Sequence, residues 1–206
     1  MTPWRVPGLA WVLVCAMVCL PAAWLGVAPL NQPAQWPPVW QELVLRPSMG
    51  WHQPLWALWT AAWLHGSVQH LTLNLLGLGF LAGMGWHWRL GPSWAVCLLL
   101  AWPLSHLGLL LDPRLTLYLG ASAFLHAGLS LWLFAARPSL SKAAFGLALL
   151  ALLAKVAWEA CASWGVGPTL VRAGADVPLA PWSHVSGVTV GLLLAGIHGA
   201  QTRDID

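Results

Sequence analysis

The feature that most constrains this chain is a series of long apolar runs separated by short polar turns. Hydrophobic residues make up 59% of the 206 residues, and charged residues only 7%. A soluble domain carries roughly a quarter charged residues, so this chain has too few of them to cover a surface in water. The sequence therefore predicts an all-α integral membrane protein, because a helix satisfies its own backbone hydrogen bonds within lipid.

Six of these runs are close to the length of a membrane-spanning helix, which is roughly 20 mostly apolar residues. The predicted spans are 8–28, 68–87, 93–111, 120–136, 141–162 and 183–200. We predict that residues 1–206 form a single domain, a six-helix membrane bundle. The fourth run is short, and its start at Gly120 indicates a helix that begins below the membrane surface, inside protein.

Two segments leave alternatives open. The first run follows Arg5 and contains Pro21, as a signal peptide would, but it stays apolar to Leu30, which favours an uncleaved span. Residues 29–67 are rich in proline and tryptophan, so we expect a long loop that lies partly in the membrane interface. An apolar stretch at 55–64 is too short to span, although a seventh span there is an alternative.

Basic residues near the span ends predict the orientation of the chain. If the N-terminus lies inside, the inner segments hold more Lys and Arg than the outer ones, as expected for cytoplasmic loops. The inner residues are Arg5, Arg89, Arg137, Lys142 and Arg203, and the outer ones are Arg46, Arg114 and Arg172. Both termini are therefore expected in the cytoplasm. The second, fourth and sixth spans then start on the outer side, so their first turns lie at similar depth.

Polar motifs occupy those three first turns. They are the segments His65–Asn74, Gly120–Ala123 and His184–Gly191. His70 and Asn74 are four residues apart, which puts both on one face of a helix. Polar groups within a membrane are costly, and they usually face the interior of the bundle and mark function. The three motifs are therefore predicted to form one site.

These residue types are the ones that acyl transfer requires. The Ser122 hydroxyl is a poor nucleophile until a base takes its proton, and the His184 imidazole suits that role near neutral pH. The oxyanion that forms needs hydrogen-bond donors. An Asn side-chain N–H, a His ring N–H and the Ser122 backbone N–H, at a helix N-terminus, can provide them. We predict Ser122 as the nucleophile and His184 as the base.

Small residues predict how the two helices that carry this pair meet. Gly187 and Gly191 follow His184 by three and seven residues, so all three lie near one face. Residues of this size let helices approach closely in lipid. The serine helix offers small partners, such as Ala127. We expect close packing that brings the imidazole within reach of Ser122.

The three motifs together resemble those of the rhomboid intramembrane proteases. They read H-x4-H-x3-N, then G-x-S, then H-x2-G-x3-G, in an order and spacing that cover most of the chain. The resemblance implies a six-helix rhomboid fold and a Ser–His dyad made by Ser122 and His184. The residues to which it gives oxyanion binding or support are His70, Asn74, His65 and Gly120.

Two details resemble the rhombosortase subfamily, whose members are bacterial enzymes that process proteins with a Gly-Gly-type C-terminal sorting tail. One is the pair Leu125-His126 after the serine, and the other is Lys155 with Glu159, four residues apart. This resemblance implies a location in the bacterial inner membrane and a single-span membrane protein as substrate. One departure is Ala123, where many rhomboids have glycine. Alanine is still small, so we expect activity to survive.

Several of these residues also have a simpler structural interpretation. Ser122 alone would more often cap a helix. Lys155 and Glu159 are interpreted first as a mutually neutralising pair that faces the interior, with contact to the substrate as the alternative. His126 lies one turn after Ser122 and is expected to line the site. Asp176 is the acid best placed to complete a triad, although the resemblance implies a dyad.

Other classes of protein are not supported. The chain has no H-E-x-x-H zinc motif and no pair of intramembrane aspartates, and its basic residues form no stripe for nucleic acid. No metal or organic cofactor is expected, and the expected partners are the lipid bilayer and a transmembrane substrate. Two rivals remain. One is an inactive rhomboid relative that binds membrane clients, and the other is a small transporter or proton channel.

Overall fold

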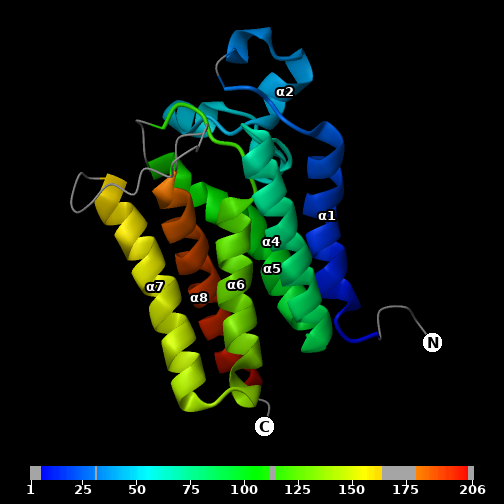
Figure 1. Ribbon diagram of the computed structural model, residues 1–206, viewed down its shortest axis with the longest axis vertical. Coiled ribbons are helices and arrows are strands. Elements are labelled where there is room, and N and C mark those ends of the chain that lie inside the picture. The colour runs from blue at the N-terminus through cyan, green and yellow to red at the C-terminus, as the bar shows by residue number, and fades with distance from the viewer. Residues whose placement is uncertain (1–5, 31, 112–114, 164–179, 204–206) are drawn as a thin grey trace.

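The computed structural model describes residues 6–30, 32–111, 115–163 and 180–203. Six long helices dominate these ranges, and successive ones run in opposite directions (Figure 1). They are α1 (Leu9–Leu25), α4 (Val68–His87), α5 (Pro92–Leu107), α6 (Ser122–Ala136), α7 (Lys142–Ser163) and α8 (Pro181–Arg203). The described residues include no strand beyond two isolated β-bridges. The prediction of an all-α fold is confirmed.

The long helices differ in how well they suit a membrane. In the described part of the chain, three segments are long and apolar enough to cross one: Pro92–Leu111, Lys142–Cys161 and Pro181–Ala200. α1 is apolar but shorter. α4 has 20 residues, but its polar side chains and glycines lower its mean hydropathy, and α6 has only 15 residues. α1, α4 and α6 therefore fall short in length or in hydropathy, and two of them, α4 and α6, carry residues of the predicted site in their first turns.

The core lies where α1, α4, α5 and α6 cross. Trp11, Trp102 and Phe124 are among its largest fully buried side chains. The Trp11 indole N–H donates to the carbonyl of Leu81 at 2.8 Å, which satisfies its polar atom inside the bundle. The ring lies against Gly85, where any β-carbon would overlap it. α1 and α4 therefore pack at the close distance that a glycine permits.

The segment that was expected to be a long loop contains short helices. They are α2 (Pro38–Leu43), α3 (Ala57–Thr60) and the 3₁₀ helices Pro33–Gln35, Pro47–His52 and Ala61–Trp63. Three of these five begin with proline, whose fixed φ suits the first helical position. Residues 55–64 contribute only α3 and a 3₁₀ turn, so the alternative of a seventh span is not supported. The segment lies over one end of the bundle (Figure 1).

Two backbone bridges attach this segment to the bundle. Leu45 and Tyr118 exchange a pair of backbone hydrogen bonds of 3.1 and 2.8 Å. Val27 bridges to His65, and the Ala28 N–H donates to the His65 carbonyl at 2.7 Å. Both bridges lie just before a helix that carries part of the site, α4 or α6. The segment therefore holds the chain in place where these helices begin.

Candidate active site

The first turns of α4, α6 and α8 lie at the same end of the bundle, under the segment of short helices (Figure 1). His70 is in the first turn of α4, where Ser67 is the N-cap and its hydroxyl accepts from the His70 backbone N–H at 3.1 Å. Ser122 is the first residue of α6. His184 is in the first turn of α8. Three segments far apart in sequence thus contribute to one region.

Direct backbone contact between α6 and α8 sets the spacing of these first turns. A β-carbon at Gly187 would overlap the carbonyl oxygen of Ala123, and one at Gly191 would lie 2.5 Å from the carbonyl oxygen of Ala127. Only a residue without a side chain fits at either point. Small residues at this four-residue spacing bring helix backbones together in membranes, as they do here.

The hydroxyl of Ser122 faces the region where α6 and α8 meet. Ala121 is the N-cap of α6, so Ser122 is not the helix cap that the simpler interpretation allowed. The Ser122 hydroxyl oxygen lies 3.3 Å from the Tyr118 hydroxyl and 3.3 Å from the Ser183 hydroxyl. Within the described residues these are its two hydrogen bonds, and neither is with His184. Its neighbour Ser183 directly precedes His184.

His126 links the two halves of the predicted dyad. Its Nδ1 lies 2.7 Å from the Ser122 carbonyl oxygen, to which an Nδ1–H donates. Its ring stacks on the ring of His184 with centroids 4.1 Å apart and planes 18° apart. The residue that was expected to line the site therefore contacts both Ser122 and His184. This stacking fixes the side of the His184 ring that faces α6.

α7 contributes a charged pair that contacts Nδ1 of His184. Lys155 and Glu159 form an ion pair, with Nζ and Oε2 2.9 Å apart, as the neutralising interpretation predicted, but Lys155 is exposed and does not face the interior as expected. The pair also reaches both histidines. Glu159 Oε2 lies 2.7 Å from His184 Nδ1, and Lys155 Nζ lies 2.6 Å from His126 Nε2. The four side chains form one continuous network that ends at Ser122.

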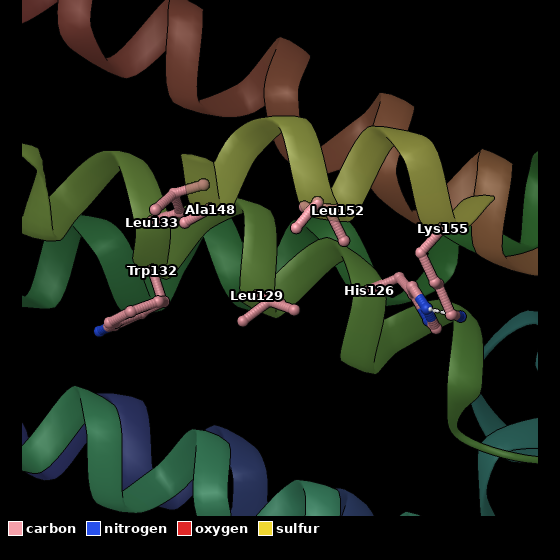
Figure 2. A pocket seen from close by; sticks show the side chains of 8 residues that line it. His126, Leu129, Trp132, Leu133, Ala148, Leu152 and Lys155 are labelled. Carbon is pink, nitrogen blue, oxygen red and sulfur yellow. Dashed lines mark hydrogen bonds between the residues drawn. The ribbon is translucent and has the colours of Figure 1, made fainter. Parts of the chain in front are cut away.

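A cavity of about 310 Å³ lies between α6 and α7 beside this network. Figure 2 shows His126 and Lys155 at one end of it, joined by their hydrogen bond. Leu129, Trp132 and Leu152 line the rest, together with other apolar side chains. The cavity is therefore apolar along its length and polar only at the end nearest Ser122.

The predicted oxyanion residues lie around the turn that precedes α6. Gly120 has a φ of 118°, a conformation that favours glycine. A β-carbon there would also lie 2.5 Å from the His70 ring. His70 thus packs directly on the backbone next to the serine. Asn74 is buried one turn further along α4, and its side-chain N–H₂ has no hydrogen-bond partner among the described residues.

Comparison with known families identifies the chain. Residues 52–201 match the family model described as Rhomboid domain, which covers α4 to α8 and every predicted site residue. The protein belongs to the rhomboid family. Rhomboids are generally intramembrane serine proteases with a helical membrane domain, so the predicted family and the class of membrane protein are confirmed. A comparison with curated proteins found no match to this chain.

Two groups of this rhomboid that lie outside the predicted spans have pKa values displaced by burial. Burial and, to a smaller extent, the neighbouring His70 lower the pKa of His65 to about 3, so His65 is neutral at physiological pH. Its ring meets that of His70 edge to face, with centroids 5.0 Å apart. Burial raises the pKa of Tyr118, which keeps its hydroxyl protonated beside Ser122.

Sequence reasoning missed two residues of the rhomboid site, Tyr118 and Ser183. Each places a hydroxyl 3.3 Å from that of Ser122, and the Ala123 N–H also donates to the Tyr118 hydroxyl at 3.3 Å. A weak signal existed for both. Tyr118 is the one tyrosine in the chain and lies four residues before the serine, and Ser183 is adjacent to His184.

Two expectations concern groups that could add to the site. Asp176, the acid considered as a third member of a triad, lies outside the described residues. Glu159, on α7, instead places a carboxylate against His184. The sequence offered no reason to expect this contact in addition to the ion pair with Lys155. Within the described residues, no three His, Cys, Asp or Glu side chains are grouped so as to hold a metal ion.

Proposed function

We propose that this rhomboid is an active intramembrane serine endopeptidase in which Ser122 is the nucleophile and His184 the base. The observation that carries the proposal is the meeting of the first turns of α6 and α8. The Ser122 hydroxyl lies 3.3 Å from that of Ser183, the neighbour of His184, and His126 contacts both members of the pair. The reaction needs the Ser122 hydroxyl to exchange its hydrogen bond with Ser183 for one with His184. Catalytic hydrogen bonds often form only once substrate is bound.

The reaction follows the acyl-transfer scheme of serine hydrolases. Ser122 Oγ attacks the scissile carbonyl carbon while its proton passes to His184 Nε2. His184 then gives that proton to the leaving nitrogen as the C–N bond breaks, which leaves an acyl-enzyme on Ser122. Water attacks this ester, with His184 again as base, and releases the second product. No metal or organic cofactor enters any step.

The oxyanion of each tetrahedral intermediate requires donors in fixed positions. We assign this role to the Asn74 amide and the His70 ring. Support comes from the packing of His70 on Gly120 and from the unpartnered, buried Asn74 N–H₂. A buried donor without a partner calls for an explanation, and an oxyanion that forms only during the reaction is one. His65 supports this arrangement from the preceding turn, with its ring against His70.

The proposed setting is the inner membrane of a bacterium, which α1, α4, α5, α6, α7 and α8 cross with both termini in the cytoplasm. The site then opens to the outer side, beneath the segment of short helices. The proposed substrate is a single-span membrane protein, cut near that side, with a Gly-Gly-type C-terminal sorting tail. Support for this subfamily comes from Leu125-His126 and from Lys155 and Glu159, all in or near the site.

Cleavage of a tagged model substrate tests this function. The substrate is a single transmembrane segment with a Gly-Gly C-terminal tail, co-expressed in bacterial membranes with wild type, Ser122→Ala or His184→Ala at matched expression. We expect wild type to cut and both variants to lose at least ~100-fold in rate, equivalent to about 2.7 kcal/mol of transition-state stabilisation. A second substrate without the tail tests the subfamily, because a sorting enzyme leaves it intact.

Matched controls separate catalysis from folding. Ser48→Ala and His52→Ala make the same changes at exposed positions of the segment of short helices, and should cut at the wild-type rate. If wild type and the two site variants behave alike on both substrates, the dyad is not catalytic. The protein would then be an inactive relative that binds membrane clients. If Ser122→Ala is harmless but a solute or proton flux is lost in His184→Ala, the transporter reading replaces the protease.

A further inference from the structure

The contacts of His184 Nδ1 raise a question about its proton. Glu159 Oε2 lies 2.7 Å from this nitrogen, and Lys155 Nζ lies 3.2 Å from it. A neutral imidazole nitrogen either donates or accepts, and cannot do both. If Nδ1 carries the proton, it donates to the carboxylate, and Nε2 is the unprotonated nitrogen. If Nδ1 accepts from the ammonium, Nε2 carries the proton and cannot act as a base.

The rest of the network favours the first state. The Lys155 ammonium has an acceptor in Glu159 Oε2 at 2.9 Å and another in His126 Nε2 at 2.6 Å, both closer than His184. With Nε2 of His126 as acceptor, its Nδ1 carries a proton and donates to the Ser122 carbonyl at 2.7 Å. One proton assignment therefore satisfies the four contacts of 2.6 to 2.9 Å in this network. It has a charged Lys155, a charged Glu159 and two neutral histidines protonated at Nδ1.

We propose that Glu159 is the positioning residue of the site, selecting the His184 tautomer in which Nε2 carries no proton and can accept that of Ser122. The inference rests on the proposed function, in which His184 is the base. Glu159 touches no reacting atom and keeps its charge throughout. The proton moves from Ser122 Oγ to His184 Nε2 and then to the leaving nitrogen, while the carboxylate balances the imidazolium charge that forms in between.

Charge neutralisation alone does not account for this geometry. Lys155 and Glu159 are four residues apart on α7, so they neutralise each other without any third group. The contact with His184 joins residues 25 positions apart on different helices, and the side chains of His184 and Glu159 are only 11% and 17% exposed. A carboxylate aimed at Nδ1 of the histidine base is the arrangement that orients that base in serine hydrolases.

The test compares wild type, Glu159→Gln, Glu159→Asp, Ser122→Ala and the control Glu42→Gln in the cleavage assay described above. Glu42 is the other glutamate of the chain and is exposed on α2, so its replacement makes the same chemical change away from the site. We expect Glu159→Gln to lower kcat by ~10²- to 10⁴-fold with KM within ~3-fold, because the wrong tautomer becomes available. Glu159→Asp should recover at least ~10-fold of that loss, since the charge is restored.

A second measurement reads the tautomer without any cleavage. ¹⁵N-histidine NMR of the protein in micelles, with the His184 signals assigned from their loss in His184→Ala, reports which ring nitrogen carries the proton. We expect an Nδ1-protonated ring in wild type and in Glu42→Gln. In Glu159→Gln we expect a shift towards the Nε2-protonated form.

The two measurements separate the failure of this inference from that of the function. If wild type cuts, Ser122→Ala does not, and Glu159→Gln cuts as fast as Glu42→Gln, the protease stands and the positioning role is overturned. If nothing cuts, the proposed function fails, and the NMR result decides the role of Glu159. A tautomer unchanged by Glu159→Gln then overturns that role, and a changed one supports it.

Discussion

α7 and α8 both pack on α6, but in opposite ways. α8 meets α6 through glycines, so closely that a β-carbon at Gly187 would overlap a carbonyl oxygen of α6. α7 leaves a cavity of about 310 Å³ between itself and α6, lined by apolar side chains. At the end nearest the site, α7 is joined to its neighbours by hydrogen bonds from Lys155 to His126 (Figure 2) and from His184 to Glu159.

This difference matches the roles proposed for the two interfaces. Ser122 and His184 need a fixed separation, and direct backbone packing sets one, because small residues bring helices together even where lipid removes the hydrophobic driving force. The charged groups of Lys155 and Glu159 need only point at the histidine rings, and hydrogen bonds hold them in that direction without tight packing of the helices. The proposed catalytic pair therefore comes from the closely packed helices, and the proposed orienting pair from the loosely packed one.

The largest expected effect comes from breaking the close interface. Gly187→Val places branched carbons where the carbonyl oxygen of Ala123 lies, so α8 must move away from α6. We expect cleavage to fall by ~100-fold or more, since a displacement of about 1 Å can have that effect. Cleavage rate in membranes and thermal unfolding in detergent are the two measurements.

Gly196→Val is the matched control for this prediction. Gly196 is exposed on the same helix, and a β-carbon there meets nothing within 4 Å. It makes the same glycine-to-valine change, with the same effect on helix propensity, but no contact with α6. Equal loss of activity in both variants would show that α8 is sensitive to any substitution, and the argument from close packing would be wrong.

A smaller effect is expected from adding volume at the two interfaces. Ala127 is fully buried on α6 opposite Gly191, whereas Ala148 is exposed on α7 and lines the cavity. Ala127→Leu should lower the free energy of unfolding by ~1–3 kcal/mol, because the core there is already filled. Ala148→Leu has open space and should change it by less than ~1 kcal/mol. Chemical unfolding of both variants in the same detergent gives the comparison, and equal values would contradict it.

The smallest expected effect is the dependence of the free energy of unfolding on pH, which arises from the buried His65. The pKa of His65 is lowered from the ordinary value of 6.5 to about 3. Below pH 6.5, His65 therefore binds a proton in the unfolded chain but stays neutral in the folded protein. The contribution is complete above that pH and is lost progressively as the pH falls towards 3. We expect the free energy of unfolding to fall by ~1 kcal/mol as the pH drops from about 6.5 to about 5.5.

Unfolding measured against pH checks this expectation. His65→Gln should flatten the dependence of the free energy of unfolding on pH between about 6.5 and about 5.5. His52→Gln, at an exposed position that also precedes α4 in the chain, should leave this dependence unchanged. A wild-type protein with no loss between those pH values would show that His65 is protonated in the folded state, contrary to its burial.

Much of the fold follows from local pattern. The long helices begin and end within a few residues of the predicted spans, because length and hydropathy are properties of each segment alone. Positions along a helix are equally local, so the shared face of His70 and Asn74 and the small-residue face of α8 could be predicted before any contact was known. The short helices within 29–67 were not predicted, since each is too short for a periodic pattern and depends on the bundle beneath it.

The residues of the candidate site could be predicted where their type and position in a motif point to a chemical role. Ser122, His184 and His126 come together because each lies near the start of a helix and those starts share one end of the bundle. Tyr118 and Ser183 were not predicted, because a lone tyrosine or serine has many ordinary roles. Their contacts with Ser122 arise only where the turn before α6 meets the first turn of α8.

By itself the sequence determined the membrane class and the helices, since both depend on composition and on periodicity within single segments, and it offered the candidate dyad through motifs that resemble those of the rhomboids. The tertiary structure alone decided which groups surround that dyad. Lys155 and Glu159 read as a closed ion pair along α7, and only the packing of α7 beside α8 turns the carboxylate onto His184 Nδ1 at 2.7 Å. A contact between helices depends on the rotation and depth of both, and neither quantity is written in the pattern of either helix.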